Sequence, residues 1–168
     1  MLKYCNSVTF AYWQRALFQR AISTIDFKGL PDTWEASVRD FFYWCLFAYG
    51  YVGVFFISTN YIGTDTFLTE DEIQKLHKSG HIIGSHAHHH VHMNALNDTQ
   101  IQYEWSTSVK ILENIIGEPI TFASIPNGDM TKSVITAASN CGIEYLYTSE
   151  PLEKMTLFNR MKIVRSEE

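Results

Sequence analysis

Residues 81–92, HIIGSHAHHHVH, join a short apolar run to a dense group of histidines. The apolar run predicts a short strand that leads into the histidine loop. All seven histidines of the chain lie between residues 77 and 92, and imidazole is the commonest metal ligand in proteins. We therefore expect a strand that ends at a metal site. The alternatives are a solvated polar loop and a histidine-rich tract that scavenges metal ions.

Strands and helices are expected to alternate on both sides of this segment. Residues 52–58 (VGVFFIS) predict a buried strand, and the acidic segment 69–72 has the form of a helix start. A longer helix, capped by residues 97–100, carries apolar residues at helical spacing. Further strands are expected at 21–27, 121–125, 144–148 and 157–164, and further helices at 32–49 and 131–141. This alternation predicts an α/β fold with a parallel sheet or barrel, whose sites form at the carboxyl ends of the strands.

The composition indicates a single globular domain over residues 1–168. Hydrophobic residues make up 46% of the chain, and a net charge of −5 without a basic run argues against nucleic-acid binding. Residues 41–64 carry no charge. Their apolar part, 41–57, is shorter than the roughly 18–20 residues that span a bilayer, so we expect no transmembrane span. The three cysteines lie far apart and predict no disulfide framework.

Several sequence landmarks follow one another in a fixed order from about Tyr49 onward. They are the strand 53–59, the approach GHIIGSH (80–86), a histidine pair spaced H-x-x-x-H, the proline-containing segment 123–128 and the ending TSEP (148–151). In this order they resemble the polysaccharide deacetylases of carbohydrate esterase family 4, which share a NodB-like domain. The H-x-x-x-H spacing alone is a weak signal, whereas the ordered set is specific.

The resemblance implies a distorted or incomplete (β/α)7-type barrel. It also implies a metal-dependent hydrolase that removes N-acetyl groups from an acetylated sugar polymer or oligosaccharide, which is the expected partner. His86 and His90 would hold a divalent metal together with one N-terminal aspartate, with zinc as the expected metal and cobalt or nickel as alternatives. Pro126, Asn127 and Gly128 are the implied substrate-binding residues. The metal would polarise the acetamide carbonyl while a neighbouring carboxylate takes the proton of the attacking water.

The N-terminal carboxylates depart from the family pattern. The family places two aspartates side by side, one as metal ligand and one as base, and this chain has no adjacent aspartate pair. Asp32 lies at nearly the family's usual distance before the strand at 52–58, so the resemblance implies that it is the third metal ligand. Asp26, at the expected end of a strand, is then the expected catalytic base. Asp32 is equally well explained as a helix N-cap, and Asp26 as a turn residue before Gly29.

The late general-acid histidine of the family is also missing, because no histidine follows His92. His88, His89 and His92 are expected mostly on the loop surface, where one of them could supply the missing group. These departures raise a second hypothesis, a degenerate member that binds metal or glycan with weak or no catalysis. A histidine-rich metal buffer is a third. Family members often act at the cell envelope, but no export signal is visible here, so the sequence assigns no compartment.

Overall fold

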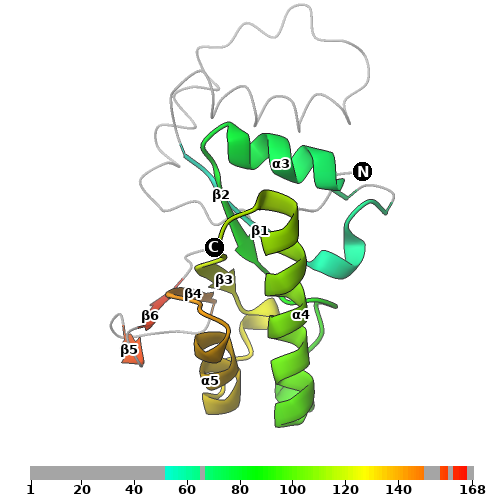
Figure 1. The fold of residues 1–168 in the computed structure, drawn as a ribbon. Helices are drawn as coiled ribbons and strands as arrows, with labels where there is room; N and C mark the ends of the chain where they lie inside the picture. Colours follow the sequence, from blue (N-terminus) through cyan, green and yellow to red (C-terminus); the bar gives the residue numbers. More distant parts are fainter. Residues whose placement is uncertain (1–51, 65–66, 150–155, 159–160, 166–168) are drawn as a thin grey trace, which may run out of the picture.

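The computed structural model describes residues 52–64, 67–149, 156–158 and 161–165 of the chain. They form a sheet of six strands in the order β1-β2-β3-β4-β6-β5 (Figure 1). The strands are β1 (Val54–Ile57), β2 (Ile82–Ser85), β3 (Phe122–Ser124), β4 (Tyr145–Thr148), β5 (Thr156–Phe158) and β6 (Met161–Arg165). Neighbouring strands run parallel except β5, which pairs antiparallel with β6. The predicted α/β fold with a parallel sheet is confirmed.

Two predicted elements, the strand at 21–27 and the helix at 32–49, lie outside the described residues, and so do Asp26 and Asp32. The distorted or incomplete (β/α)7-type barrel therefore stays a prediction, for which the described strands supply a largely parallel sheet. The assignment of residues 1–168 to one domain likewise stays a prediction.

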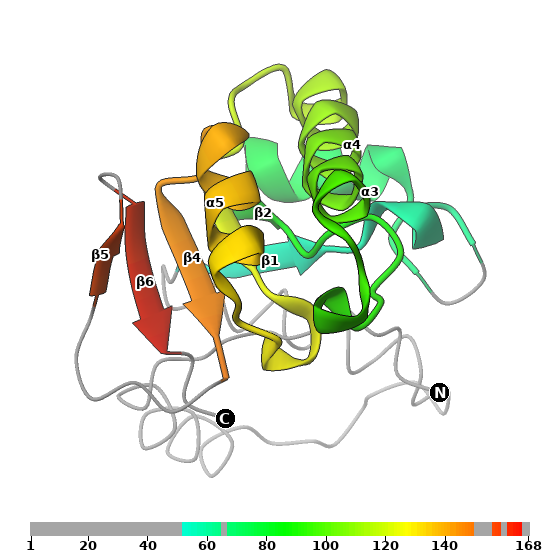
Figure 2. The same cartoon turned by 90° about the horizontal axis from the view of Figure 1, so that it is seen from below.

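Three α-helices lie against one face of this sheet, as Figure 2 shows. They are α3 (Glu70–Lys78), α4 (Asp98–Ile116) and α5 (Lys132–Asn140). Each helix connects two strands that are parallel neighbours, which gives three successive β-α-β units. This connection is the usual way to join parallel strands, because the chain must return to the amino-terminal end of the sheet before the next strand begins.

Local capping interactions fix the starts of α3 and α4. Thr69 and Glu72 form a capping box at α3, in which each side chain bonds the backbone N–H of the other residue. Asn97 and Gln100 form the same reciprocal pair at α4. A capping box satisfies two N–H groups that have no partner within the helix. Both starts agree with the sequence prediction. Helix α4 ends at Gly117, which has a φ of 78°, the left-handed conformation that glycine adopts readily.

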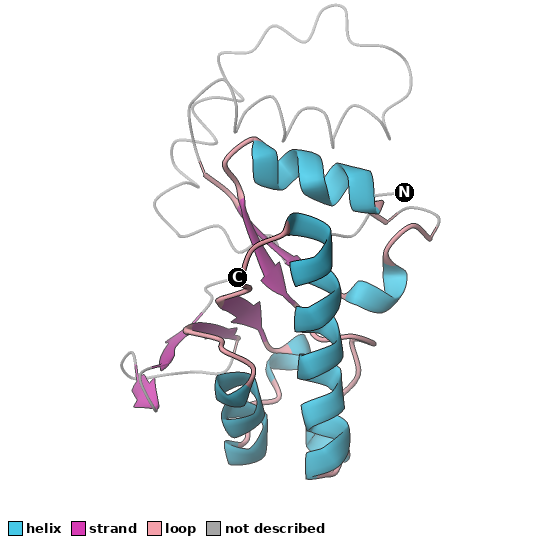
Figure 3. Ribbon diagram, viewed as in Figure 1, coloured by secondary structure: helices cyan, strands magenta, loops and turns pink. Residues whose placement is uncertain are grey.

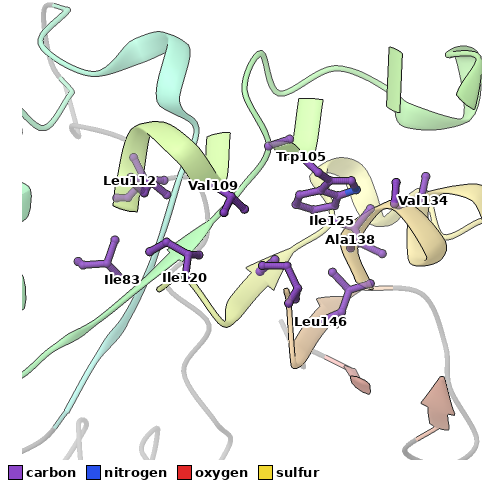
Figure 4. Close-up of a cluster of buried hydrophobic side chains, with 14 of the residues drawn as sticks. Ile83, Trp105, Val109, Leu112, Ile120, Ile125, Val134, Ala138 and Leu146 are labelled. Carbon is purple, nitrogen blue, oxygen red and sulfur yellow. The ribbon is translucent and has the colours of Figure 1, made fainter. Parts of the chain in front are cut away.

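The core lies between the helices and the sheet. Trp105, Val109 and Leu112 project from successive turns of α4 toward the strands, where they meet residues such as Ile83 of β2 and Leu146 of β4 (Figure 4). All five side chains are buried. The apolar stripe predicted along this helix is therefore core packing, which the hydrophobic effect stabilises in proportion to the area removed from water.

Gly84 allows β2 to lie close to both of its neighbours. A Cβ atom at this position would come within 2.7 Å of the ring of Phe56 on β1 and within 2.9 Å of the backbone oxygen of Phe122 on β3. Real Cβ atoms do not approach other heavy atoms so closely, because van der Waals repulsion rises steeply at these distances. The glycine therefore serves close strand packing at the place where β2 leads into the histidine loop.

One predicted element differs from the structure. Residues 157–164 were expected to form a single strand, but the chain forms β5 and β6 there, and these pair antiparallel, with Phe158 opposite Met161. The chain thus reverses direction between β5 and β6, where the sequence has the polar residues Asn159 and Arg160. As for membranes, no helix in the described part of the chain is long and apolar enough to cross a bilayer.

Candidate active site at the carboxyl ends of the strands

The histidine loop and the Pro126 loop both follow the carboxyl ends of strands, so they leave the sheet on the same side (Figure 3). β2 and β3 are parallel, with Ser85 opposite Ala123, so the segments that follow them begin side by side. The loop after β1 joins them, because the N–H of Asn60 donates to the carbonyl oxygen of His88 at 3.0 Å. Carboxyl ends of parallel strands are the usual place for a functional site. The sequence analysis expected the site at this position.

His86 is the first residue after β2 and is held rigidly. Its backbone N–H donates to the oxygen of Ile57 at 2.9 Å, and its side chain is buried, with the whole residue only 4% exposed. Its ring Nδ1 lies 2.9 Å from the carbonyl oxygen of Ser124. A carbonyl oxygen can only accept, so Nδ1 carries the proton and the lone pair of Nε2 is left for another partner.

The electrostatic environment keeps His86 neutral at pH 7. Its pKa is lowered to about 4, mainly by burial; the hydrogen bond to Ser124 opposes this shift, and the nearby His90 adds to it. Desolvation disfavours the charged imidazolium because that form loses more solvation energy than the neutral ring. A metal ion binds the neutral ring, so His86 needs no proton release before it can act as a ligand.

His90 meets His86 through a tight loop rather than a helix. The two ring centroids lie 4.9 Å apart, and the rings are tilted by 59°. Ala87 and His90 both adopt left-handed backbone angles, with φ values of 59° and 56°. Non-glycine residues rarely adopt this conformation, and such outliers concentrate at functional sites. The structure therefore brings together the two histidines that the sequence singled out as ligands.

The other histidines of the loop have separate partners. The Nδ1 atom of His88 lies 2.8 Å from Thr59 Oγ1, and burial lowers the pKa of this ring. His89 bonds to the buried carboxylate of Glu104, whereas His92 is exposed and pairs with Asp129 at 2.9 Å. His88 and His89 are half-buried rather than fully on the surface. Of the three, only His92 is exposed as expected, and the expectation that none of them is a ligand stays a prediction.

The three candidate substrate-binding residues form a single turn after β3, η3 (Pro126–Gly128). Asn127 is exposed and has a left-handed backbone with a φ of 58°, while Pro126 and Gly128 are buried. The carbonyl oxygen of Gly128 accepts a hydrogen bond from the Thr148 hydroxyl at 3.2 Å. Of the three residues, only Asn127 is therefore exposed to solvent. The hydrogen bond from Thr148 attaches its turn to β4.

Asp129 connects the two loops of the site. The sequence analysis did not identify this residue. One carboxylate oxygen accepts from His92, and the other accepts from the side-chain amide of Asn94 at 3.2 Å. These contacts span 37 and 35 residues of sequence. They tie the histidine loop to the end of the Pro126 turn, and only the fold brings the partners together.

The described residues supply part of a metal site. His86 and His90 are suitable ligands, but no group of three or more histidine, cysteine, aspartate or glutamate residues comes together within the described part of the chain. A zinc site with protein ligands needs at least three of them. The imidazole pair fits such a metal, and the remaining ligand would come from outside the described residues, where Asp26 and Asp32 lie.

Comparison with known sequences decides the family. A family model described as polysaccharide deacetylase matches residues 30–146. The chain belongs to the polysaccharide deacetylase family. The matched range includes Asp32, His86, His90 and the Pro126–Gly128 turn, and it begins after Asp26. The resemblance drawn from the ordered landmarks is thus confirmed.

A relative in Bacillus subtilis strain 168 supports this membership. It is YxkH, whose name as a polysaccharide deacetylase is itself provisional, and it is 30% identical over 103 residues. The match covers 61% of this chain and 37% of YxkH. The chain thus spans well under half of that relative's length.

Solved structures of deacetylases share the fold of this family member. The Streptococcus pyogenes deacetylase PplD superposes with a TM-score of 0.65 at 12% identity, over 93% of this chain and 72% of PplD. A Bacillus anthracis protein described as a carbohydrate esterase family 4 pseudoenzyme superposes with a TM-score of 0.54 at 14% identity, over 60% and 34% of the two chains. At these identities the likeness establishes the fold alone.

Proposed function

We propose that this deacetylase-family chain is a metal-dependent hydrolase that removes N-acetyl groups from an acetylated sugar polymer or oligosaccharide. The observation that carries the proposal is the paired arrangement of His86 and His90 at the carboxyl ends of the strands, with His86 neutral and its Nε2 lone pair available. Both histidines also lie within the range matched by the family model, and paired imidazoles suit a catalytic zinc ion.

The metal would be held by His86, His90 and Asp32, with zinc as the first choice and cobalt or nickel as alternatives. Asp32 lies within the range matched by the family model, which supports it over Asp26 as the ligand. A bound divalent metal polarises the acetamide carbonyl and acidifies a water molecule. The Ser124 carbonyl orients His86 for this task, as second partners of ligating histidines generally do.

The remaining chemistry falls to residues of the chain. Asp26 would take a proton from the attacking water, whose oxygen forms a bond to the acetyl carbon. The bond from that carbon to nitrogen then breaks, and the nitrogen gains a proton, so that one amide and one water yield acetate and an amine. The exposed Asn127 turn would contact the sugar, since it lies on the loop beside His86.

A second candidate function is binding of metal or glycan without turnover. Two features of the sequence favour it: the absence of an adjacent aspartate pair and of any histidine after His92. The Bacillus anthracis pseudoenzyme with the same fold is described as lacking the activity of its family. The two candidates share the fold and differ in the presence of a working base and a working acid.

Acetate release from acetylated chitooligosaccharides tests the proposal, with zinc, cobalt or nickel added in turn. The wild-type chain should release acetate only with metal, and His86→Ala and His90→Ala should lose both turnover and bound metal. His77→Ala is the matched control, because His77 pairs with Glu118 and belongs to neither loop of the site. Metal binding without acetate release would favour the second candidate, and full activity of His86→Ala would overturn the proposal.

The two aspartates can be separated in the same assay. Asp32→Ala should lose bound metal, whereas Asp26→Ala should keep the metal and lose acetate release, because one residue is assigned as ligand and the other as base. The reverse pattern would exchange their roles. Retention of metal and activity in both variants would remove both aspartates from the mechanism.

A further inference from the structure

The carboxylate of Glu104 lies buried in α4 and points at the backbone of the histidine loop. The residue is only 5% exposed. Its Oε2 accepts hydrogen bonds from the N–H groups of His88 and His89 at 3.0 and 2.8 Å, and its Oε1 lies 2.7 Å from His89 Nδ1. We propose that Glu104 is a positioning residue that holds the loop in the shape that aims His90 at His86. This inference rests on the proposed function, which assigns both histidines as metal ligands.

The charge of Glu104 is directed at the loop rather than at solvent. A buried carboxylate loses much hydration energy and persists where several donors replace the lost water. Hydrogen bonds to an ionised acceptor are shorter and stronger than neutral ones, and the 2.7 and 2.8 Å contacts agree with this. Within the described part of the chain, the hydrogen-bond partners of the Glu104 carboxylate belong to His88 and His89. The hydrogen bonds of Glu104 therefore stabilise the centre of the histidine loop.

A second contact from α4 holds the beginning of the same loop. Ser108, one turn further along the helix, bonds to Ser85 with 2.8 Å between the hydroxyl oxygens. Ser85 in turn accepts the N–H of Ala87 at 3.2 Å. The helix thus fixes the loop at its start through a serine pair and at its centre through Glu104.

The loop shape needs such an anchor because its backbone is unfavourable. Ala87 and His90, on either side of the two amides bound by Glu104, are both left-handed. Chirality disfavours this conformation for residues with a side chain. Without the carboxylate, we expect the loop to relax toward ordinary backbone angles. The His90 ring would then leave its place 4.9 Å from the His86 ring.

Substitutions separate the anchoring contacts from the bulk of the helix. Glu104→Ala removes all three contacts, while Glu104→Gln keeps one oxygen for the two N–H groups and offers an N–H to His89. Leu112→Ala is the control, because Leu112 is buried two turns further along α4 and belongs to the core. Where Glu104→Ala fails to fold, Glu104→Asp replaces it, since its carboxylate is one methylene farther from the loop.

Zinc affinity of the full chain, measured by competition with a chromophoric chelator, gives the first readout. Glu104→Ala should weaken it by about 10–100-fold, the usual cost of losing a residue that orients a ligand. Glu104→Gln should recover most of the loss, and Leu112→Ala should bind like the wild type at a temperature where it is folded. Zinc affinity of Glu104→Ala within twofold of the wild type would overturn the inference.

NMR gives a second readout that needs no metal. In Glu104→Ala, the amides of His88 and His89 should exchange faster than those of Leu112→Ala, and the nuclear Overhauser contact between the rings of His86 and His90 should be lost. Unchanged exchange and an unchanged ring contact would overturn the inference. If the wild-type chain binds no zinc, the proposed function fails, while these two NMR observations still decide the role of Glu104.

Discussion

The Nδ1 atom of His86, which follows β2, lies 2.9 Å from the backbone oxygen of Ser124, the last residue of β3. One strand thereby fixes the tautomer and ring orientation of a histidine that the neighbouring strand presents. The acceptor is a main-chain atom, so no substitution at residue 124 removes it directly. The sheet itself therefore preorganises the first half of the proposed metal pair.

Stability of the metal-free protein should fall as the pH falls from about 6.5 to about 4. In the unfolded chain His86 takes up a proton near pH 6.5, whereas in the folded chain burial lowers its pKa to about 4. The unfolded state then binds more protons over this window, so protonation favours unfolding. This stability, roughly 3 kcal/mol, is fully present above pH 6.5 and is lost progressively as the pH falls to about 4. Urea unfolding with a chelator present measures it.

His86→Gln is the control for this pH dependence. The variant cannot titrate at residue 86, so its unfolding free energy should change less between pH 7 and pH 4 than that of the wild type. Burial also lowers the pKa of His81 and His88, so some dependence of the same sign should remain. Identical pH profiles for the two proteins would mean that His86 is not held neutral by burial.

Gly84→Ala should destabilise the fold. The added methyl group would meet Phe56 and the backbone oxygen of Phe122 at distances below 3 Å, so β1 or β3 must move. Overpacking of this kind costs about 1–3 kcal/mol, measurable as a lower midpoint of urea unfolding. Because β2 leads into the histidine loop, zinc affinity should also fall. A midpoint equal to that of the wild type would show that the strands separate without cost.

The chain should bind one zinc ion tightly. The proposal assigns one ion to His86 and His90, whose ring centroids lie 4.9 Å apart. It assigns none to His88, His89 and His92, whose Nδ1 atoms bond to Thr59, Glu104 and Asp129. Isothermal titration should give a stoichiometry of one for the wild type and for His92→Ala, with the tight site lost in His90→Ala. Several ions of similar affinity per chain would instead indicate a histidine-rich metal buffer.

Asp129→Ala should affect substrate binding more than turnover. Asp129 joins His92 and Asn94 to the end of the Pro126 turn, so its loss should loosen the turn that presents Asn127. We expect a several-fold rise in KM with little change in kcat. Stability should change by about 1 kcal/mol, because solvent screens the exposed His92 side of the pair. Glu118→Ala, which removes a contact to His77 away from the site, should change neither constant.

Local patterns predicted the helices and strands well because their causes lie within a few residues. The capping pairs Thr69–Glu72 and Asn97–Gln100 set helix starts from neighbours three residues apart. The strands from β1 to β4 follow from short apolar runs between helices. The prediction of one strand over 157–164 was wrong because it overlooked Asn159 and Arg160, two polar residues that lie in sequence between β5 and β6.

The candidate site was only partly predictable. The spacing of His86 and His90 pointed to the pair, and the structure brings their rings together. Glu104 and Asp129 gave no signal, because their partners lie 15 to 37 residues away in sequence and only the packing of α4 and the loops unites them. Within its helix, Glu104 resembles any polar residue. The roles of Asp26 and Asp32 stay predictions, since both lie outside the described residues.

The central claim is that His86 and His90 hold a catalytic metal together with an N-terminal aspartate. A zinc-soaked crystal, with data collected at the zinc absorption edge, tests it most directly. We expect one strong anomalous peak about 2.0–2.1 Å from the Nε2 atom of His86 and from a ring nitrogen of His90, with an oxygen of Asp32 as the next ligand. A peak bound elsewhere in the histidine loop, or no peak beside His86, would contradict it.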